Sequence, residues 1–165
     1  HRLGAIYCAS CQEKTIMTAQ LTDNLKYMGE TMCLTTLPLS AYWSIARLHQ
    51  ELAEGDNHEF SDMGTWCWRR HTASWQIEQD HLYLVSINAT YKDGAKVMLE
   101  DFFPGYPERV FAHWFSGELC CPCGELLEYV HAGFASRYAE ELLIQVERGV
   151  VKGQQLRDNR VQGEV

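Results

Sequence analysis

The sequence predicts a mostly β protein, either an antiparallel sandwich or a partly open barrel, with one or two short helices. Short apolar runs recur about every 8–12 residues with turn-forming residues between them, which is typical of such folds. Within several runs, apolar and polar residues alternate, as they do in a strand with one buried face. Hydrophobic residues make up 46% and charged residues 22% of the 165 residues, as in ordinary globular domains. We therefore expect about eight to ten strands.

Charge and hydropathy restrict the partners that this chain is expected to bind. Fourteen basic and 22 acidic residues give a net charge of −8, which disfavours binding to a phosphate backbone. No run approaches the roughly 18 apolar residues that a membrane helix needs. The sequence therefore predicts a protein or small-molecule partner, and neither nucleic acid nor a membrane.

The cysteine count and the N-terminal sequence indicate the cellular compartment and the residue at which the folded domain begins. Seven cysteines, an odd number, and an N-terminus without an apolar signal region favour the reducing cytoplasm. Met17 begins a stretch that resembles a natural start, so residues 1–16 are predicted to be a disordered or non-native extension. A single β-rich domain is expected over residues 17–158, followed by a flexible tail at 159–165.

The first predicted element is a hairpin, with strands at 24–28 and 31–37 around Gly29-Glu30. Pro38 is expected to end the second strand because it has no N–H to donate. Residues 44–64 are polar and acidic, which indicates a long surface excursion. Within them, residues 45–52 could form two helical turns with Ile45, Leu48 and Leu52 on one face.

The centre of the core is predicted in a hairpin with strands at 75–78 and 82–87, joined by residues 79–81. Alternation directs Trp75 and Ile77 to the same face. Trp66 and Trp68 would share a face of a preceding strand.

Between the central and last hairpins, turns alternate with short elements. Residues 92–94 should form a turn before a short strand at 96–99, and residues 101–107 form a turn with a buried aromatic anchor. Val110, Phe111 and Trp114 lie at a spacing that predicts one or two helical turns over residues 108–115.

Two hairpins are predicted in the last third of the chain. Their strands are 117–121 with 125–130, turning at residues 122–124, and 140–147 with 150–156, turning at Arg148-Gly149.

Several motifs resemble a family of small uncharacterised bacterial proteins. They are Trp75-x-Ile77, Leu82-Tyr83-Leu84, Phe103-Pro104, the run from Val110 to Leu119, and Leu126-Leu127-x-Tyr129-Val130-His131-x-Gly133-Phe134. The resemblance covers roughly residues 17–158. It implies a bacterial, β-rich protein but no activity, because the family is one of hypothetical proteins. The turn at 122–124 is usually Pro-x-Gly without cysteine in that family, so Cys120, Cys121 and Cys123 depart from its pattern.

A zinc site is the metal alternative. Cys8 and Cys11 form a Cys-x-x-Cys pair, and with Cys121 and Cys123 they could give the four thiolates of a structural zinc site. Adjacent residues of a strand point to opposite faces, so Cys120 and Cys121 cannot both bind one ion. We therefore favour ordinary strand and turn roles for these cysteines, and no cofactor.

The polar segment 128–141 contains the candidate ligand-binding residues His131, Arg137 and Tyr138. An enzyme would need a site around His113, His131, Arg137 and Glu141. The simpler hypothesis is a hydrogen-bonded loop at one end of the fold. The sequence lacks the usual hydrolase, nucleotide-binding and metalloprotease motifs.

Aromatic residues are 12% of the chain, and Trp66, Trp68 and Trp75 could form a ring-binding stripe. Core packing is the more common role of such residues. An exposed aromatic patch would instead favour ligand binding.

The sequence therefore favours a non-catalytic binding or accessory module. A small zinc-binding protein and an enzyme with the site named above are the alternatives.

Overall fold

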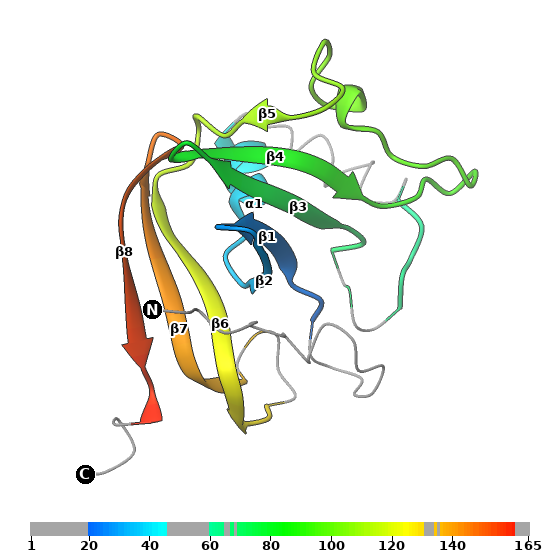
Figure 1. The fold of residues 1–165 in the computed structure, drawn as a ribbon. Coiled ribbons are helices and arrows are strands. Elements are labelled where there is room, and N and C mark those ends of the chain that lie inside the picture. The colour runs from blue at the N-terminus through cyan, green and yellow to red at the C-terminus, as the bar shows by residue number, and fades with distance from the viewer. Residues whose placement is uncertain are drawn as a thin grey trace.

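The computed structural model describes residues 20–45, 60–64, 67, 69–130, 134 and 136–160. Within these residues, eight strands form one sheet with the order β2-β1-β3-β4-β8-β7-β6, and β5 adds to β4 (Figure 1). The strands and helices are β1 (Asp23–Tyr27), β2 (Glu30–Leu34), α1 (Pro38–Ile45), β3 (Thr72–Glu78), β4 (His81–Asn88), the 3-10 helix η3 (Leu99–Asp101), β5 (Val110–Phe111), β6 (Gly117–Glu128), β7 (Arg137–Glu147) and β8 (Val150–Asp158).

The sheet curls into a partly open barrel. All pairs are antiparallel except β1 and β3, which run parallel. The outermost strands meet where the Thr35 N–H donates to the Cys120 carbonyl at 3.0 Å. On the opposite side, β4 and β8 pair only through His81 and Val150; from there β4 runs across the top of the molecule and β8 runs downward (Figure 1). The prediction of a mostly β fold is confirmed, with a barrel rather than a sandwich.

Three of the predicted hairpins are confirmed. They join β1 to β2, β3 to β4, and β7 to β8. Each turns through two residues with positive φ: Met28-Gly29, Gln79-Asp80 and Arg148-Gly149. This is the conformation that matches the right-handed twist of paired strands.

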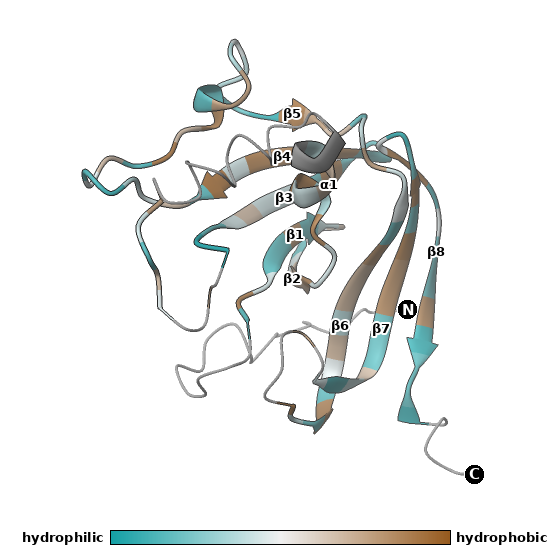
Figure 2. Ribbon diagram, turned by 180° about the vertical axis from the view of Figure 1, so that it is seen from behind, coloured by the Kyte–Doolittle hydropathy of each residue, from teal (hydrophilic) through white to brown (hydrophobic). Residues whose placement is uncertain are grey.

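The hydrophobic core lies inside the curl. Trp75 is 1% exposed and Ile77 is 8% exposed, so both face inward as alternation predicted. Leu25 of β1, Leu84 of β4 and Ile144 of β7 face the same interior. Figure 2 shows long hydrophobic stretches on β6 and β7, whereas β8 is mostly hydrophilic.

Helix α1, which the sequence did not predict, packs against the inner face of the sheet (Figure 2). Pro38 does not end the second strand, because β2 already ends at Leu34; Pro38 is instead the first helical residue, where its fixed φ favours a helix. Leu39 enters the core, and Tyr42 contacts Phe103 and Trp114 at ring-centroid distances of 4.9 and 4.7 Å. The Trp114 indole N–H donates to the Pro38 carbonyl at 2.8 Å.

The predicted helix over residues 108–115 is wrong. Val110 and Phe111 instead form β5, paired with Leu84 and Tyr83. In this strand Val110 faces the core, next to the central hairpin. Tertiary pairing therefore decided the conformation of this short segment.

The strand predicted at residues 96–99 is also wrong. Only Lys96 makes a bridge, to Thr90, and Leu99–Asp101 form a 3-10 turn. The Asp101 carboxylate accepts from the Met98 N–H at 3.0 Å and so stabilises this turn. The buried aromatic anchor of the following turn is confirmed as Phe103, which is 8% exposed.

The hairpin predicted around Pro122 is wrong, because β6 continues from Gly117 to Glu128. Cys120 directs its backbone groups towards β2, and Pro122 has the same orientation two residues later. The ladder of β6 is formed with β7 on the other edge, so a missing N–H on the edge that faces β2 removes no bond of that ladder. The pairing of β6 with β7 shifts register after Pro122, between Cys123 and Leu126.

Other predictions concern residues outside the described part of the chain. These are the extension 1–16, most of the helix at 45–52, Trp66 and Trp68, and His131. None of the helices in the described residues has the length and apolar character needed to span a bilayer.

A candidate binding face on strands β3, β4 and β5

Aromatic rings gather on the outer surface of β4 and β5. Leu82 and Leu84 of β4 point into the core, so His81 and Tyr83 point outward. The Tyr83 ring lies 5.9 Å and the His81 ring 5.3 Å from the Phe111 ring, and all three residues are half-buried. His113 extends the group at 6.5 Å from Phe111.

Arg109 completes this group by stacking on Tyr83. Its guanidinium carbon lies 4.0 Å from the Tyr83 ring centroid, and Nη1 lies 2.8 Å from the Glu78 carboxylate. The stack and the ion pair hold a long side chain in one place. We call His81, Tyr83, Arg109, Phe111 and His113 the aromatic face.

The same outer surface continues as a ladder of neutral polar groups. The Ser74 hydroxyl accepts from the Asn24 and the Asn88 side-chain amides, both at 3.0 Å. The Asn88 amide also donates to the Thr72 hydroxyl at 3.2 Å, and its carbonyl oxygen accepts from Ser86 at 3.0 Å. We call Asn24, Thr72, Ser74, Ser86 and Asn88 the polar ladder.

Strand register joins the ladder to the aromatic face. The residues of β3 that face the core are Ala73, Trp75 and Ile77, so the residues between them face outward. Gln76 pairs with Tyr83, and Ser74 pairs with Ser86. The ladder and the aromatic rings therefore form one continuous outer surface.

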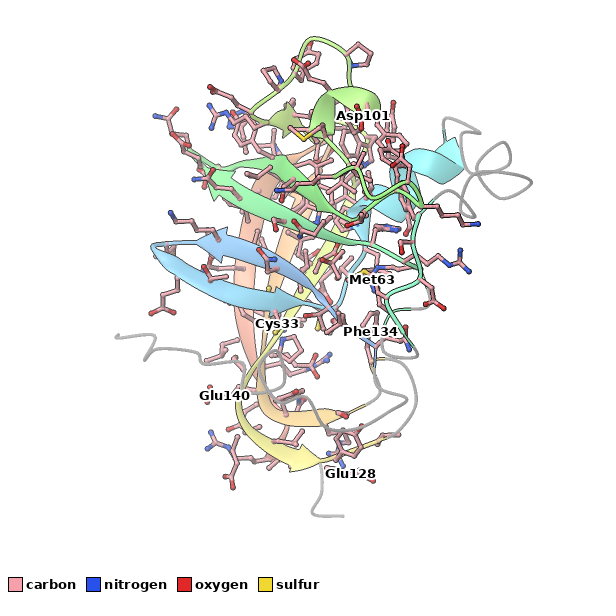
Figure 3. All side chains as sticks on the ribbon, turned by 90° about the vertical axis from the view of Figure 1, so that its right-hand side faces the viewer. Cys33, Met63, Asp101, Glu128, Phe134 and Glu140 are labelled. Atoms are coloured by element: carbon pink, nitrogen blue, oxygen red, sulfur yellow. The ribbon has the colours of Figure 1, made fainter. Side chains whose placement is uncertain are left out.

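The described residues among those predicted to bind a ligand, Arg137 and Tyr138, lie elsewhere. Arg137 begins β7 and has a 3.7 Å ion pair with Glu128, which Figure 3 places at the end of the sheet opposite Asp101. Tyr138 follows it and is half-buried. His131 is outside the described residues.

The residues of the enzyme alternative are not brought together where the structure describes them. His113 lies near the Gly149 turn, because the Gly149 N–H donates to the Phe115 carbonyl at 2.9 Å. Arg137 lies at the other end of β7, about 30 Å away at about 3.3 Å per strand residue.

Glu141 of the same set has a different environment, on the outer side of β7. Burial alone would raise its pKa, but hydrogen bonds from Cys120 and Asn159 and the charge of Arg157 hold the pKa below its ordinary value. Its oxygens accept from Cys120 at 3.2 Å and from Asn159 at 2.9 Å, and it also pairs with Arg157. These contacts tie β6, β7 and the end of β8 together.

The cysteines of β6 occupy both sides of the sheet, as alternation predicted. Cys121 is fully buried in the core and Cys123 is 3% exposed, whereas Cys120 contacts Glu141. Burial raises the pKa of Cys120 and of Cys123 to about 11 and also raises that of Cys121. Burial therefore favours the neutral thiol over the thiolate, which is the nucleophilic form.

A metal centre has no ligand set in the part of the chain that the structure describes. No three His, Cys, Asp or Glu side chains there are grouped so as to hold a metal ion. Cys8 and Cys11, half of the zinc alternative, lie outside the described residues. Cys33 of β2 is disulfide-bonded, while Cys67, Cys120, Cys121 and Cys123 are free thiols.

A buried polar group not predicted from the sequence surrounds Asp23, which is 2% exposed. Its carboxylate accepts from Arg69 at 2.7 Å, the Ala73 N–H at 2.9 Å and the Trp75 indole at 3.0 Å. Burial raises the pKa of Asp23, although the charge of Arg69 and these hydrogen bonds oppose the rise. With its oxygens satisfied and the core around it, Asp23 anchors β1 to β3 rather than facing a ligand.

The sequence also did not single out the aromatic face. A signal was present, because His81-Leu82-Tyr83-Leu84 and Val110-Phe111-Ala112-His113 both alternate ring and aliphatic side chains. Seeing that the two segments pair required β5 to be recognised as a strand.

Comparison with known proteins identifies no relative. No protein-family model matches the chain, and no curated protein or solved structure is significantly similar to it. The resemblance to a bacterial family therefore stays a hypothesis, and the function has to be argued from the geometry.

Proposed function

We propose that the protein is a non-catalytic binding module that contacts its partner through the aromatic face. The observation that carries this proposal is the cluster of Tyr83, Phe111 and His81 on the surface, with Arg109 stacked on it. Tyrosine, phenylalanine and arginine are enriched at recognition surfaces because they combine large contact area with hydrogen-bonding groups.

The support beneath the rings favours recognition over accidental exposure. The Leu82 N–H donates to the Gly149 carbonyl and the Ala112 N–H to the Leu82 carbonyl, both at 2.8 Å. These bonds fix β5 and the β7–β8 turn along the same edge of β4, opposite β3. A surface held in place loses less conformational entropy when a ligand binds.

The chemistry of the other candidate residues supports a non-catalytic role. The thiols of β6 are held in their protonated form by burial, and Glu141 is occupied by Cys120, Asn159 and Arg157. A nucleophile or a general base needs a group that is available to the substrate.

The proposal is tested by binding to arrays of immobilised peptides and glycans. The wild-type protein is expected to bind at least one probe saturably, and Tyr83→Ala should abolish that binding while the circular dichroism spectrum is retained. Tyr106→Ala removes an aromatic side chain that is 56% exposed outside the face, and it should bind like the wild type.

Two results would contradict the proposal. One is binding that is equal in the wild type and in Tyr83→Ala. The other is the absence of saturable binding to every probe.

A further inference from the structure

We infer that the ligand of this binding module is a neutral oligosaccharide that lies along the outer surface of β3 and β4, over the aromatic face and the polar ladder. The inference rests on the proposed function and adds to it the chemical class of the ligand. It depends on the juxtaposition of surface rings with uncharged hydrogen-bonding side chains on a single sheet face.

The aromatic face supplies the apolar part of sugar recognition. One side of a pyranose ring presents C–H groups, which pack against aromatic rings. Phe111 and His81 are half-buried and lie beside Tyr83, whose ring is itself stacked by Arg109. A sugar ring placed there would contact rings and could also receive hydrogen bonds from the guanidinium.

The polar ladder supplies the hydrogen bonds. Sugar hydroxyls both donate and accept, so a matching surface needs both kinds of group. Ser74 accepts from two amides, which leaves its own O–H to donate. The Asn24 side chain uses its amide nitrogen on Ser74, which leaves its carbonyl oxygen as an acceptor. The ladder therefore presents donors and acceptors on side chains that are already oriented.

The extent of this surface favours a chain of sugars over a single ring. Tyr83 and Asn88 are five residues apart on β4, which corresponds to about 17 Å at about 3.3 Å per residue. A ligand that contacts the rings and the far end of the ladder must span this length.

Charge selects a neutral glycan among the possible ligands. The five side chains of the polar ladder are uncharged, and Arg109 in the aromatic face is paired with Glu78. The whole chain carries a net charge of −8, so sulfated or phosphorylated polymers would be repelled. A neutral polyhydroxylated chain matches the surface without such a penalty.

The experiment is a titration of the full chain, labelled with nitrogen-15, with neutral gluco-, xylo- and chito-oligosaccharides longer than a disaccharide. At least one should shift the amide resonances of β3 and β4 in a saturable way. Calorimetry should show that Tyr83→Ala and Ser74→Ala each weaken binding by about tenfold or more. Tyr106→Ala, outside the face, should bind within about twofold of the wild type.

The outcomes separate this inference from the proposed function. If only peptides bind, and do so in a Tyr83-dependent way, the binding module stands and the glycan inference is overturned. Tighter binding of a sulfated glycan than of any neutral one also overturns it. If neither peptides nor glycans bind, both fail. The resonance shifts of the wild-type protein decide the question even if a variant does not fold.

Discussion

At the scale of single residues, burial decides the protonation of His71. This side chain is 5% exposed, and its Nδ1 lies 2.8 Å from the Arg69 carbonyl, to which it donates as the neutral ring. Burial and, to a smaller extent, the charge of Arg69 lower the pKa of His71 to about 4, while the hydrogen bond to the Arg69 carbonyl opposes the shift. The residue is therefore neutral in the folded protein over most of the acidic range.

The stability of the protein should consequently fall as the pH falls from about 6.5 to about 4. In this range the unfolded chain takes up a proton at residue 71 that the folded chain does not, which favours unfolding. The loss attributable to His71 is about 3 kcal/mol over the range. His71→Asn keeps a donor near the Nδ1 position and should flatten this part of the profile.

Urea unfolding of the wild type and His71→Asn across this pH range measures the effect. Tyr106→Ala, an exposed substitution, serves as the control and should keep the wild-type slope. Parallel profiles for the wild type and His71→Asn would show that His71 does not govern the pH dependence.

The cysteines lead to a second prediction at this scale, concerning metal. The purified protein should contain no stoichiometric zinc, and a chelator should leave its thermal midpoint unchanged. Cys121 and Cys123 are buried with raised pKa values, Cys120 is on the other side of the sheet, and a closed zinc site needs four ligands. Elemental analysis and a melting curve with EDTA provide the measurement. About one zinc per chain, with unfolding on chelation, would instead support the zinc-binding alternative.

At the scale of elements, two hairpin turns share a backbone conformation but differ in their surroundings. Met28-Gly29 has φ values of 52° and 80°, and Arg148-Gly149 has 50° and 81°. A Cβ added at Gly29 would meet nothing within 4 Å, whereas at Gly149 it would lie 2.7 Å from the Ala112 carbonyl oxygen and 2.8 Å from the Phe111 ring. Comparing substitutions at Gly29 and Gly149 therefore separates the cost of backbone strain from the cost of a tertiary clash.

Gly149→Ala should therefore destabilise the protein more than Gly29→Ala. Both variants place a side chain at positive φ, at a cost of about 1–2 kcal/mol. Gly149→Ala adds overpacking against β5, for a further cost of about 1–3 kcal/mol. Equilibrium urea unfolding of the two variants gives the comparison. Equal losses of unfolding free energy in the two variants would mean that β5 shifts to accommodate the added methyl group without a measurable cost.

At the scale of the whole molecule, a few hydrogen bonds close one side of the barrel. The Thr36 hydroxyl accepts from the Cys120 N–H at 2.9 Å and donates to the Glu118 carbonyl at 3.1 Å. The Thr35 hydroxyl adds a 3.2 Å bond to the Cys120 carbonyl. These bonds join β6 to the end of β2, whose own ladder lies on its other edge with β1.

Thr36→Val should open this contact, because it leaves the Cys120 N–H and the Glu118 carbonyl without their shared partner. The expected loss of stability is about 1–3 kcal/mol, with faster hydrogen exchange at the Cys120 amide. The matched control is Thr31→Val, an exposed position on β2, which should change stability by less than about 0.5 kcal/mol. Unchanged exchange at Cys120 in Thr36→Val would show that the barrel closes without the hydroxyl.

Local pattern alone was sufficient for three hairpins and for the core position of Trp75. Gly29 and Gly149 favour two-residue turns, and alternation in β3 and β4 assigns each side chain to a face. These signals depend on residues that are neighbours in the chain, so no tertiary information was needed.

The candidate site was predicted less well. The sequence directed attention to His131, Arg137 and Tyr138, but the described residues of this set lie at the lower end of β7, far from the aromatic face. The rings of that face come from two segments about 30 residues apart, and only the pairing of Tyr83 with Phe111 brings them together.

Tertiary structure alone decided the remaining features. Pro122 reads locally as a turn, yet β6 passes through it because β6 forms its ladder with β7 on the other edge. Residues 108–115 fit a helical spacing, yet β4 offers an edge on which Val110 and Phe111 form a strand. A short segment gains less free energy from its own propensity than from burying side chains and pairing its backbone with a distant strand. The sequence by itself therefore determined the hairpins and their buried faces, while the curl of the sheet, and with it the surface proposed to bind the ligand, depended on long-range pairing.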